Sequence, residues 1–414
     1  MADVDVLVIG GGPAGLAAAS ALKRLGIERA MVIERETEAG GVPRHCGHPP
    51  FGWREYRRIL TGPAYARRLV EQAGALGVEV RPATAAVRLQ PGGRVEVTSP
   101  QGAQTIAARR VVIATGARET PRSARLIGGT RPLGVLTTGA LQALVYLKQR
   151  IPFRRPVIVG TELVSLSALL TCRHAGIRPA AMIEAADRPT APRPLTVYPR
   201  LFGIPIHYRS RIQSIEGDER VEAVCVDGPD GERTIACDGV LCTGRFVPEA
   251  ALLRGSDIAL DAAAGGPLVD QYGRCSDPVY FAAGNVLRPI ETAGWSWQEG
   301  CDVARVVADD LAGRLPAPQW DTMLTVTPPV RLVVPQRLSW PLDGRAGAEH
   351  LQLRVERPVS GTLAVTSDSR TIWHRRMRAL PERRMLIPVD KIARAASPGP
   401  LVVEFQESQT GRMT

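Results

Sequence analysis

The sequence predicts an α/β protein with two Rossmann-like domains and a small C-terminal β-sandwich. About the first thirty residues read as strand, glycine-rich turn, helix and strand, and the same order returns from residue 157. Beyond the second domain, short alternating strands separated by Pro, Gly, Ser and Asp turns replace this pattern. We expect the first domain at residues 1–123 and 246–316, the second inserted at residues 124–245, and the β-sandwich at residues 318–414.

Length and composition favour a globular protein of several domains. The chain has 414 residues, 44% of them hydrophobic and 22% charged. It contains no run of about 18 apolar residues, so we expect no membrane span. The N-terminus enters a strand at once and lacks a signal-peptide pattern, which favours a cytoplasmic location.

The chain is basic, with a formal net charge of +11. Its arginines are spread along the sequence and are not interleaved with aromatic residues, which make up only 5% of the chain. We therefore expect no nucleic-acid partner, and favour instead an acidic protein partner or an anionic cofactor or substrate.

The seven cysteines do not suggest a disulfide scaffold. Their number is odd and none forms a C-x-x-C pair. Cys225, Cys237 and Cys242 fall in apolar, strand-like runs, where cysteine usually acts as a small buried hydrophobic residue.

The first βαβ unit, "DVLVIGGGPAGLAAASALKRLGIERAMVIERE", has each part that a dinucleotide site needs. Gly10 permits the tight turn, Gly12 lets the backbone approach a pyrophosphate, and Gly15 allows close packing of helix and strand. The helix N-terminus offers free N–H groups and a positive dipole to phosphates. Glu34 ends the second strand, where an acid binds ribose hydroxyls.

Three later segments carry a family resemblance: "RRVVIATGARETPR" from Arg109, "DGVLCTGRFVPE" from Asp238 and "PVYFAAGNV" from Pro278. Together with the first unit they resemble the two-dinucleotide-binding-domain flavoproteins, the glutathione and thioredoxin reductase superfamily. This resemblance implies FAD in the first domain and NAD(P)H in the second.

By the same resemblance, Gly284 and Asn285 contact FAD. The family usually has Gly-Asp here, and the Asp holds the ribityl chain; an amide still forms hydrogen bonds but carries no charge. A helix from about Ser296 would direct its N-terminus at the flavin ring and stabilise a reduced, anionic flavin. The flavin edge is expected to contact Glu291, Thr292 and Gly294. The residues expected to bind FAD are Gly10, Gly12, Pro13, Ala14, Gly15, Glu34, Arg35, Gly41, Ala114, Thr115, Gly116, Gly284, Asn285, Thr292 and Ala293.

The second nucleotide motif is altered. It reads Gly160-Thr161-Glu162-Leu163-Val164-Ser165, so a glutamate replaces the second glycine and a serine the third. A carboxylate within a few Å of a pyrophosphate costs about 1–4 kcal/mol at a moderate effective dielectric. We therefore expect this domain to be a degenerate NAD(P) site. Glu184 still ends the second strand, either as a remnant of a ribose contact or as a contact for an adenine nucleotide bound differently.

The segment "GGVPRHCGHPPFG", residues 40–52, lies where glutathione reductase relatives carry a redox disulfide, but it has one cysteine. Cys46 with His45 and His48 offers at most three ligands, so we expect no metal site. Two interpretations stay open. The segment is a surface loop shaped by its prolines, or it brings Cys46 and His48, the candidate catalytic residues, near the flavin or a contact with another subunit.

A closer resemblance covers about residues 1–315 and is carried by this loop together with "LTGPAYARRLVEQA", "ATGARETPRSARLIGG", "GVLTTGALQ" and "FAAGNVLRPIETAGW". These motifs resemble the FAD subunits of multisubunit dehydrogenases: those of opine oxidase and hydrogen cyanide synthase, and the α subunits of sarcosine oxidase and dye-linked proline dehydrogenase. The resemblance implies a second flavoprotein subunit that oxidises an amine, amino acid, opine or hydroxy compound. The partner would be similar to D-amino acid oxidase (DAO-like) or to glycerol-3-phosphate dehydrogenase, and a small ferredoxin-like subunit is a further candidate.

The C-terminal region departs from those subunits, several of which end in a cysteine-rich [2Fe–2S] domain. No cysteine follows Cys301, so this region cannot bind a [2Fe–2S] cluster. A cluster, or another flavin, is expected on partner subunits. The predicted β-sandwich instead resembles the C-terminal part of flavoproteins associated with glycerol-3-phosphate dehydrogenase-like subunits. It contains an arginine group that is either a site for an acidic partner or a solvated face: Arg375, Arg376, Arg378, Arg383 and Arg384.

Three functions are therefore weighed. The leading one is an FAD-dependent oxidoreductase subunit that relays electrons within a hetero-oligomeric dehydrogenase or oxidase. The second is a self-contained NAD(P)H-dependent flavin reductase, and the third is a non-catalytic FAD-binding scaffold subunit.

Overall fold

The computed structural model describes residues 2–191, 195, 197–289, 291–318, 322–340, 347–381, 383–395 and 398–408. These residues form two compact units, which are described separately. Unit 1 comprises Met1–Gly41, Arg68–Ala117 and Pro248–Thr414, and unit 2 comprises Val42–Arg67 and Arg118–Val247. Residues 42–67, which we had expected to belong to the first domain, therefore belong with the inserted one.

Unit 1 is built on a parallel sheet of buried apolar strands. In spatial order these are β3 (Glu79–Arg81), β2 (Ala30–Ile33), β1 (Val4–Ile9), the end of β6 (Gly102–Ile113) and β18 (Tyr280–Ala282). Strands β1 and β2 read as nearly continuous apolar runs because both faces of this sheet are covered. The first predicted Rossmann-like domain is confirmed.

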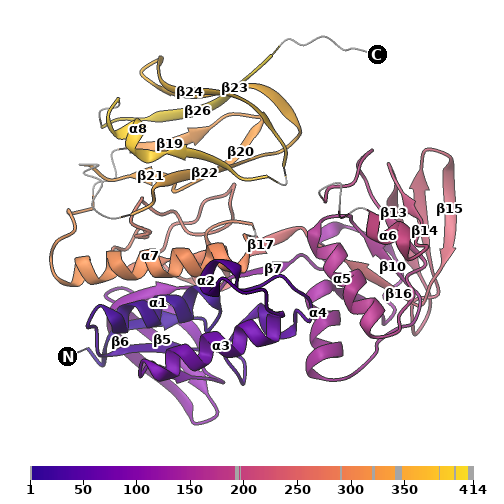
Figure 1. Ribbon diagram of the computed structural model, residues 1–414, viewed down its shortest axis with the longest axis horizontal. Helices are drawn as coiled ribbons and strands as arrows, with labels where there is room; N and C mark the ends of the chain where they lie inside the picture. The colour runs from indigo at the N-terminus through magenta and orange to yellow at the C-terminus, as the bar shows by residue number, and fades with distance from the viewer. Residues whose placement is uncertain are drawn as a thin grey trace. The chain divides into compact units, whose positions relative to one another are not determined.

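Helices α1 (Pro13–Arg24) and α7 (Ala293–Leu311) lie side by side on this sheet (Figure 1). Their backbones approach closely, because a Cβ added to Gly300 would lie 2.1 Å from the carbonyl oxygen of Ala14. The first half of β6 continues into an antiparallel extension with β5 (Arg94–Ser99) and β4 (Ala85–Gln90), which the sequence analysis did not predict.

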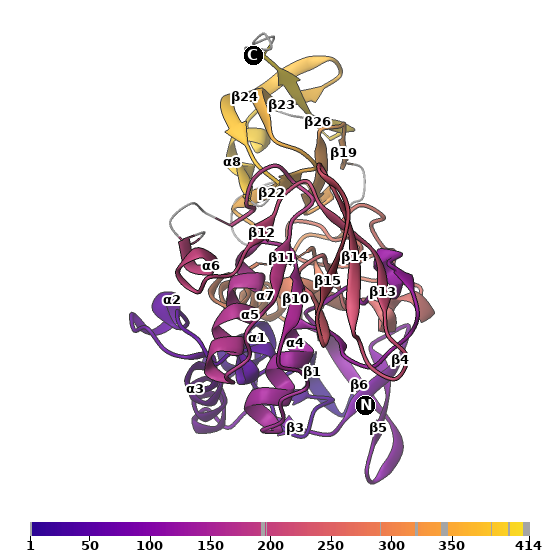
Figure 2. The same ribbon diagram turned by 90° about the vertical axis from the view of Figure 1, so that its right-hand side faces the viewer.

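Unit 2 repeats the Rossmann-like arrangement. Its five-stranded parallel sheet has the order β12 (Ile206–His207), β11 (Ala181–Ile183), β10 (Pro156–Val159), β16 (Gly239–Cys242) and β9 (Val135–Thr137). Strands β10, β11 and β12 of this sheet are labelled in Figure 2. The second predicted Rossmann-like domain is thereby confirmed.

Alternate residues of the unit 2 sheet contribute to two cores. On one face, Ile158 and Leu241 pack with Leu169 of α5 (Leu163–His174). On the other face, Val157 and Val240 belong to a cluster with residues of a second, four-stranded sheet. That sheet has the order β15 (Gly231–Ala236), β14 (Ala223–Gly228), β13 (Arg211–Glu216) and β8 (Gly128–Gly129).

The C-terminal region is the predicted β-sandwich, and it belongs to unit 1. The larger sheet has the order β21 (Arg337–Leu338), β19 (Thr322–Val326), β26 (Leu401–Glu407), β23 (Val359–Ser367) and β24 (Arg370–Ala379). The smaller has the order β20 (Val330–Val334), β22 (His350–Val355) and β25 (Met385–Pro388). Alternating residues of both sheets form one buried core, as expected for a sandwich.

The sandwich also packs on the sheet domain of its own unit. Leu332 and Val334 of β20 join the core of the first Rossmann-like domain. Buried Asp270 accepts hydrogen bonds from Arg274 Nε at 2.9 Å and from Ser339 Oγ at 3.0 Å, which ties a loop of that domain to the sandwich. The two parts of unit 1 are therefore continuous in packing.

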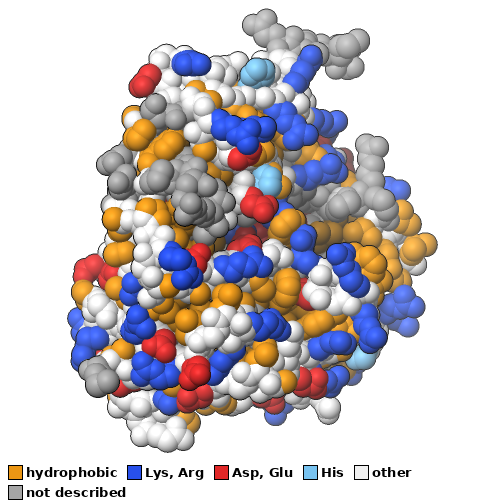
Figure 3. Space-filling model, turned by 60° about the vertical axis from the view of Figure 1, so that its left-hand side comes forward, with side chains coloured by type: hydrophobic (Ala, Val, Ile, Leu, Met, Phe, Trp, Pro, Cys, Tyr) orange, Lys and Arg blue, Asp and Glu red, His pale blue; other side chains and the backbone are white. Residues whose placement is uncertain are grey.

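The remaining helices and strands are short or lie in connections. They are α2 (Trp53–Tyr56), α3 (Gly62–Ala75), β7 (Ala117–Glu119), α4 (Thr138–Gln142), α6 (Val197–Leu201), β17 (Phe246–Pro248) and α8 (Val389–Ala393). In the face drawn in Figure 3, Lys and Arg side chains are scattered among acidic and apolar ones.

Candidate functional site

The turn after β1 leaves the first helix start open. Gly10 has a φ of +111°, and a Cβ there would lie 2.5 Å from the carbonyl oxygen of Ala114. Gly12 is the N-cap of α1 and Pro13 its first residue, and no side chain caps the helix. The N–H groups of the first turn are thus left for a ligand, which fits a pyrophosphate.

At Gly15 and Gly41, too, the backbone lies close to other backbone atoms of this turn. A Cβ on Gly15 would lie 1.9 Å from the carbonyl oxygen of Gly10, and one on Gly41 would lie 2.8 Å from Cα of Gly12. The amide of Gly40 donates to the carbonyl of Gly11 at 2.7 Å. The chain at residues 40–41 therefore crosses directly over the phosphate turn.

Glu34 lies at the end of β2 with only 7% of its surface exposed. Its carboxylate accepts the backbone N–H of Gly11 at 2.8 Å and that of Glu36 at 2.9 Å. These two bonds use about half of the acceptor positions of a carboxylate, so capacity remains for ribose hydroxyls. Arg35, in contrast, is exposed, 3.7 Å from Glu36.

Two further predicted FAD segments lie in the same unit. Thr115 Oγ1 donates to the carbonyl of Glu249 at 2.7 Å, and the amide of Glu249 donates to the carbonyl of Gly116 at 2.8 Å. Residues 114–116 are therefore held against the returning chain. Gly116, with a φ of +78°, makes the turn.

The segment before α7 is closed by Asn285. Its side-chain amide accepts the N–H of Glu291 at 2.8 Å and donates to the Glu291 carbonyl at 3.1 Å. Thr292 is the N-cap of α7 and Ala293 its first residue, and no side chain caps this helix either. All fifteen residues expected to bind FAD lie in unit 1, and its two uncapped helix starts fit that cofactor.

The second unit has a similar turn after β10, but a glutamate side chain fills it. Gly160 has a φ of +112°, and Glu162 is the N-cap of α5. The Glu162 carboxylate folds inward, where Thr243 Oγ1 donates to it at 2.6 Å. A Cβ on Gly160 or on Gly244 would lie 2.3 Å and 2.2 Å, respectively, from its oxygens. The side chain thus fills space between the glycine turns, and its burial raises the pKa of this carboxyl.

Two more carboxylates lie near these turns. Glu184 accepts a hydrogen bond from Thr161 Oγ1 and one from the amide of Ala186. Glu119 accepts the N–H of Gly139, in the first turn of α4, at 2.8 Å and that of Gly244 at 3.0 Å. Burial raises the pKa of Glu119. The role of Glu119 could not be predicted from the sequence, because nothing in "ARETPR" shows which distant amides this carboxylate contacts.

The loop with Cys46 is anchored within unit 2. Cys46 Sγ donates to Gln142 Oε1 at 3.4 Å, and Gln142 Nε2 donates to Ser167 Oγ at 2.7 Å. Ser167 Oγ is 2.5 Å from His48 Nε2. A Cβ on Gly47 would lie 2.1 Å from the ring of Tyr146, so a larger residue there would have to displace that ring.

This environment makes Cys46 a neutral thiol. Cys46 is 9% exposed, and burial, with a smaller contribution from Glu119, raises the pKa of its thiol to about 12. A reactive cysteine needs the opposite shift. All seven cysteines are free, and no group of three or more metal-binding side chains occurs among the described residues.

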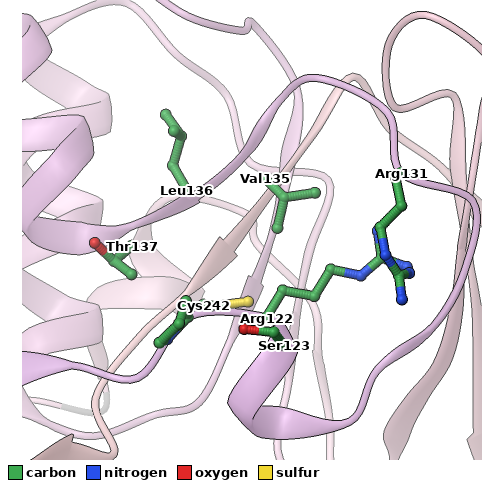
Figure 4. Close-up of a pocket in the computed structure, with 8 residues that line it drawn as sticks. Arg122, Ser123, Arg131, Val135, Leu136, Thr137 and Cys242 are labelled. Carbon is green, nitrogen blue, oxygen red and sulfur yellow. The ribbon is translucent and has the colours of Figure 1, made fainter.

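A pocket of about 280 Å³ opens in unit 2 beside Val135, Thr137 and Cys242, with Arg122 and Arg131 at its wall (Figure 4). Both arginines are already engaged by backbone carbonyls. Arg122 donates to Ile127 and Thr130, and Arg131 to Gly129. We therefore interpret this pocket as a feature of loop packing.

The sequence profile of the pyridine nucleotide-disulphide oxidoreductase family matches residues 4–300, which is more than half of the chain. The chain belongs to this family. Membership indicates an oxidoreductase that binds FAD, as the sequence predicted.

Two curated relatives, both the A subunit of an opine oxidase, are similar to this member of the family. The relative from Rhizobium meliloti (strain 1021) is 33% identical over 184 residues, which are 44% of this chain and 39% of that protein. The relative from Agrobacterium tumefaciens (strain Ach5) is 26% identical over 347 residues, 76% of this chain and 64% of that protein. The chain thus spans less than two thirds of the length of either relative.

Solved structures give the same fold. Thioredoxin reductase of T. acidophilum superposes with a TM-score of 0.61 at 22% identity, covering 74% of this chain and 98% of that one. L-proline dehydrogenase of P. horikoshii superposes with a TM-score of 0.57 at 20% identity, covering 75% and 56%. Within the described part of the chain, no helix is long and apolar enough to cross a membrane.

Proposed function

We propose that this chain is the FAD-binding, electron-relaying subunit of a hetero-oligomeric dehydrogenase or oxidase. One observation carries the proposal. The helix start at Gly12 is open for a pyrophosphate, whereas the equivalent turn of the second unit is filled by the buried carboxylate of Glu162. An FAD protein with an impaired NAD(P) site must exchange its electrons with something else.

A partner subunit would supply those electrons. The similarity to the two opine oxidase relatives supports a partner flavoprotein, DAO-like or glycerol-3-phosphate dehydrogenase-like, that oxidises an opine, amine, amino acid or hydroxy compound. A small ferredoxin-like subunit would be a further member. The likeness to hydrogen cyanide synthase, sarcosine oxidase and proline dehydrogenase subunits belongs to this proposal. So do the domain boundaries expected from the sequence, except that residues 42–67 group with the second unit.

FAD would supply a two-electron acceptor, and the chain's own residues would hold it. The N–H groups at the start of α1 would bind its phosphates, and Glu34 a ribose. The start of α7 at Thr292 would place a positive dipole at the developing negative charge of the reduced ring.

Copurification with the products of neighbouring genes tests the proposal. We expect a complex that contains FAD in this chain, and bleaching of its visible absorbance by the partner's substrate under anaerobic conditions. A chain that is monomeric, fully active alone and without flavin would contradict it.

Rapid mixing with NADH and NADPH separates the alternatives. We expect bleaching much slower than turnover of the complex. Fast bleaching by either nucleotide would instead establish a self-contained reductase. A flavin that dithionite reduces but no partner does would establish a scaffold subunit.

A further inference from the structure

Glu291, the residue before the N-cap of α7, is held by two arginines of the β-sandwich. Its side chain is only 7% exposed. Arg354 of β22 pairs with one carboxylate oxygen through Nη2, and Arg384, which precedes β25, lies 3.8 Å from the other through Nη1. Two segments more than 60 residues away in sequence thus meet at the start of this helix.

This contact is mechanically linked to the proposed cofactor residues. Asn285 binds both the N–H and the carbonyl of Glu291, so the Glu291 backbone is fixed relative to Gly284 and Asn285. Glu299, two turns into α7, accepts the amide of Gly284 at 3.2 Å. Gly284 and Asn285 are therefore held against Glu291 and Glu299, on either side of the start of α7.

The same cluster continues through Glu299. Arg288 Nη2 and Gln352 Nε2 both donate to Glu299 Oε1. Arg288 is 1% exposed, and its Nε and Nη1 have no hydrogen-bond partner in the described part of the chain. Gln352, like Arg354, comes from β22, so the sandwich contributes to both halves of the cluster.

The cluster carries surplus positive charge in a buried place. Three arginines, Arg288, Arg354 and Arg384, face two glutamates, Glu291 and Glu299, which leaves one net positive charge. Asp302, which lies near Glu299, is paired with Arg305 and adds no net charge. Burial lowers the pKa of Arg384, but an arginine starts so high that it stays charged. Its guanidinium carbon lies 3.8 Å from the centroid of the Trp295 ring, which covers it. Charges in such low-dielectric surroundings act over longer distances than surface charges.

We propose that Arg354 and Arg384 are positioning residues by which the β-sandwich sets the reduction potential of FAD, acting through Glu291 and the start of α7. The inference rests on the proposed FAD site. A net positive charge beside the helix start stabilises the reduced, anionic flavin more than the oxidised one. The β-sandwich is then part of the redox site and not only a docking module.

Two substitutions of opposite charge test this inference. Glu291→Gln removes a negative charge and is expected to raise the potential, whereas Arg384→Gln removes a positive charge and is expected to lower it. Each change should shift the ratio of reduced to oxidised FAD about tenfold at a fixed potential, which is about 30 mV for a two-electron couple. The potential is measured by equilibration with a reference dye under anaerobic conditions.

The controls separate charge from structure. Arg384→Lys keeps the charge and should restore the native potential. Arg357→Gln and Glu407→Gln make the same charge changes in an exposed pair of the same sandwich, and should leave the potential unchanged. Should Arg384→Gln fail to fold, Arg354→Gln and Arg354→Lys provide the same test of sign.

The outcomes are distinguishable. A native chain that holds FAD, with variants that leave the potential unchanged or shift it in one common direction, would overturn this inference but not the proposed function. A native chain that neither contains nor takes up FAD would overturn the proposed function and the inference with it.

Discussion

The helix start of the first βαβ unit is formed by Gly12 and that of the second by Glu162, on nearly the same backbone. Gly12 has φ −82° and ψ −172°, and Glu162 has φ −73° and ψ 174°. The preceding glycines, Gly10 and Gly160, have φ values of +111° and +112°. The two turns therefore follow nearly the same path, although Thr161, Glu162 and Ser165 stand where the first unit has Gly11, Gly12 and Gly15.

The acids at the ends of the second strands also accept similar hydrogen bonds in the two units. Glu34 and Glu184 each accept a bond from the phosphate turn of their own unit and one from an amide two residues further on. The second unit thus keeps the turn conformation and the strand-end acid of the first, while the Glu162 carboxylate fills the space between its glycine turns. Exchanging Gly12 and Glu162 between the two units tests whether this side chain accounts for the difference between them.

The largest effect is expected from Gly12→Glu, which gives the first unit the side chain of the second. The backbone there suits glutamate, and a Cβ on Gly12 has no neighbour closer than Cα of Gly41 at 3.8 Å, so the fold should persist. Repulsion between the carboxylate and the pyrophosphate should weaken FAD binding at least about a hundredfold, or about 3 kcal/mol. Fluorescence titration of the apoprotein measures this.

Gly12→Ala is the matched control, because it adds the Cβ without the charge. It should retain FAD within about a factor of ten. If Gly12→Glu binds FAD as tightly as the native chain, the first helix start is not the phosphate site.

A smaller effect is expected from Glu162→Gly, which gives the second unit the side chain of the first. Without the Glu162 carboxylate, the single proton of Thr243 Oγ1 can be donated to the carbonyl of Val159, which lies 2.6 Å away, so this hydroxyl keeps a hydrogen bond. Binding of NADH should strengthen about tenfold, the equivalent of about 1.4 kcal/mol. Isothermal titration calorimetry gives the dissociation constant.

Glu162→Gln separates charge from volume. It removes the repulsion but leaves the space filled, so its NADH affinity should lie between those of Glu162→Gly and the native chain. Equal affinity in all three proteins would show that Glu162 does not control this site.

Local pattern accounts for the part of the molecule that could be predicted. The buried runs around Val6 and Val157, each followed by a glycine turn, predict both Rossmann-like domains, because strand burial and tight turns leave local signatures. The alternating strands at the C-terminal end predict the sandwich in the same way. Several residues expected to bind FAD lie in such a turn, so the same local pattern also led to the predicted site, which stays a prediction.

Contacts between distant side chains could not be predicted. His48 meets Ser167 across 119 positions, and Glu291 meets Arg354 across 63. Neither pairing leaves a periodic trace, so the anchoring of the 42–52 loop in unit 2 and the part played by the sandwich at α7 appear only in three dimensions. Arg384 was predicted as part of a basic surface, but its guanidinium lies over Trp295 and beside Glu291.

The buried carboxylate should also affect stability against pH. Burial raises the pKa of Glu162 in the folded state above its ordinary value of 4.5, so the folded chain binds this proton more tightly than the unfolded one. The native chain should therefore lose stability relative to Glu162→Gln as the pH rises from about 4.5 through the folded pKa. The difference between the two urea-unfolding free energies should therefore grow over this pH range.

Glu407→Gln provides the opposite control, since Arg357 lowers the pKa of Glu407. There the native chain should gain stability relative to its variant as the pH rises. If the difference in unfolding free energy between the native chain and Glu162→Gln does not change with pH, the Glu162 carboxyl does not titrate with a raised pKa in the folded chain.

The smallest effect is expected from Cys46→Ser, in the loop that unit 2 holds. A hydroxyl can donate to Gln142 Oε1 as the thiol does, and the two side chains are similar in size, so the midpoint of thermal unfolding and the FAD content should be nearly unchanged.

Since the pKa of Cys46 is about 12, almost no thiolate is present near neutral pH, and the native chain should not be alkylated there by iodoacetamide. Peptide mass spectrometry before and after unfolding in guanidinium checks this. Any loss in Cys46→Ser should appear as slower electron transfer to the partner, because the substitution is expected to leave the fold and the FAD content unchanged. Loss of all flavin, or a stoichiometric metal in the native chain, would show that this loop belongs to the cofactor site after all and would weaken the contrast between the two units.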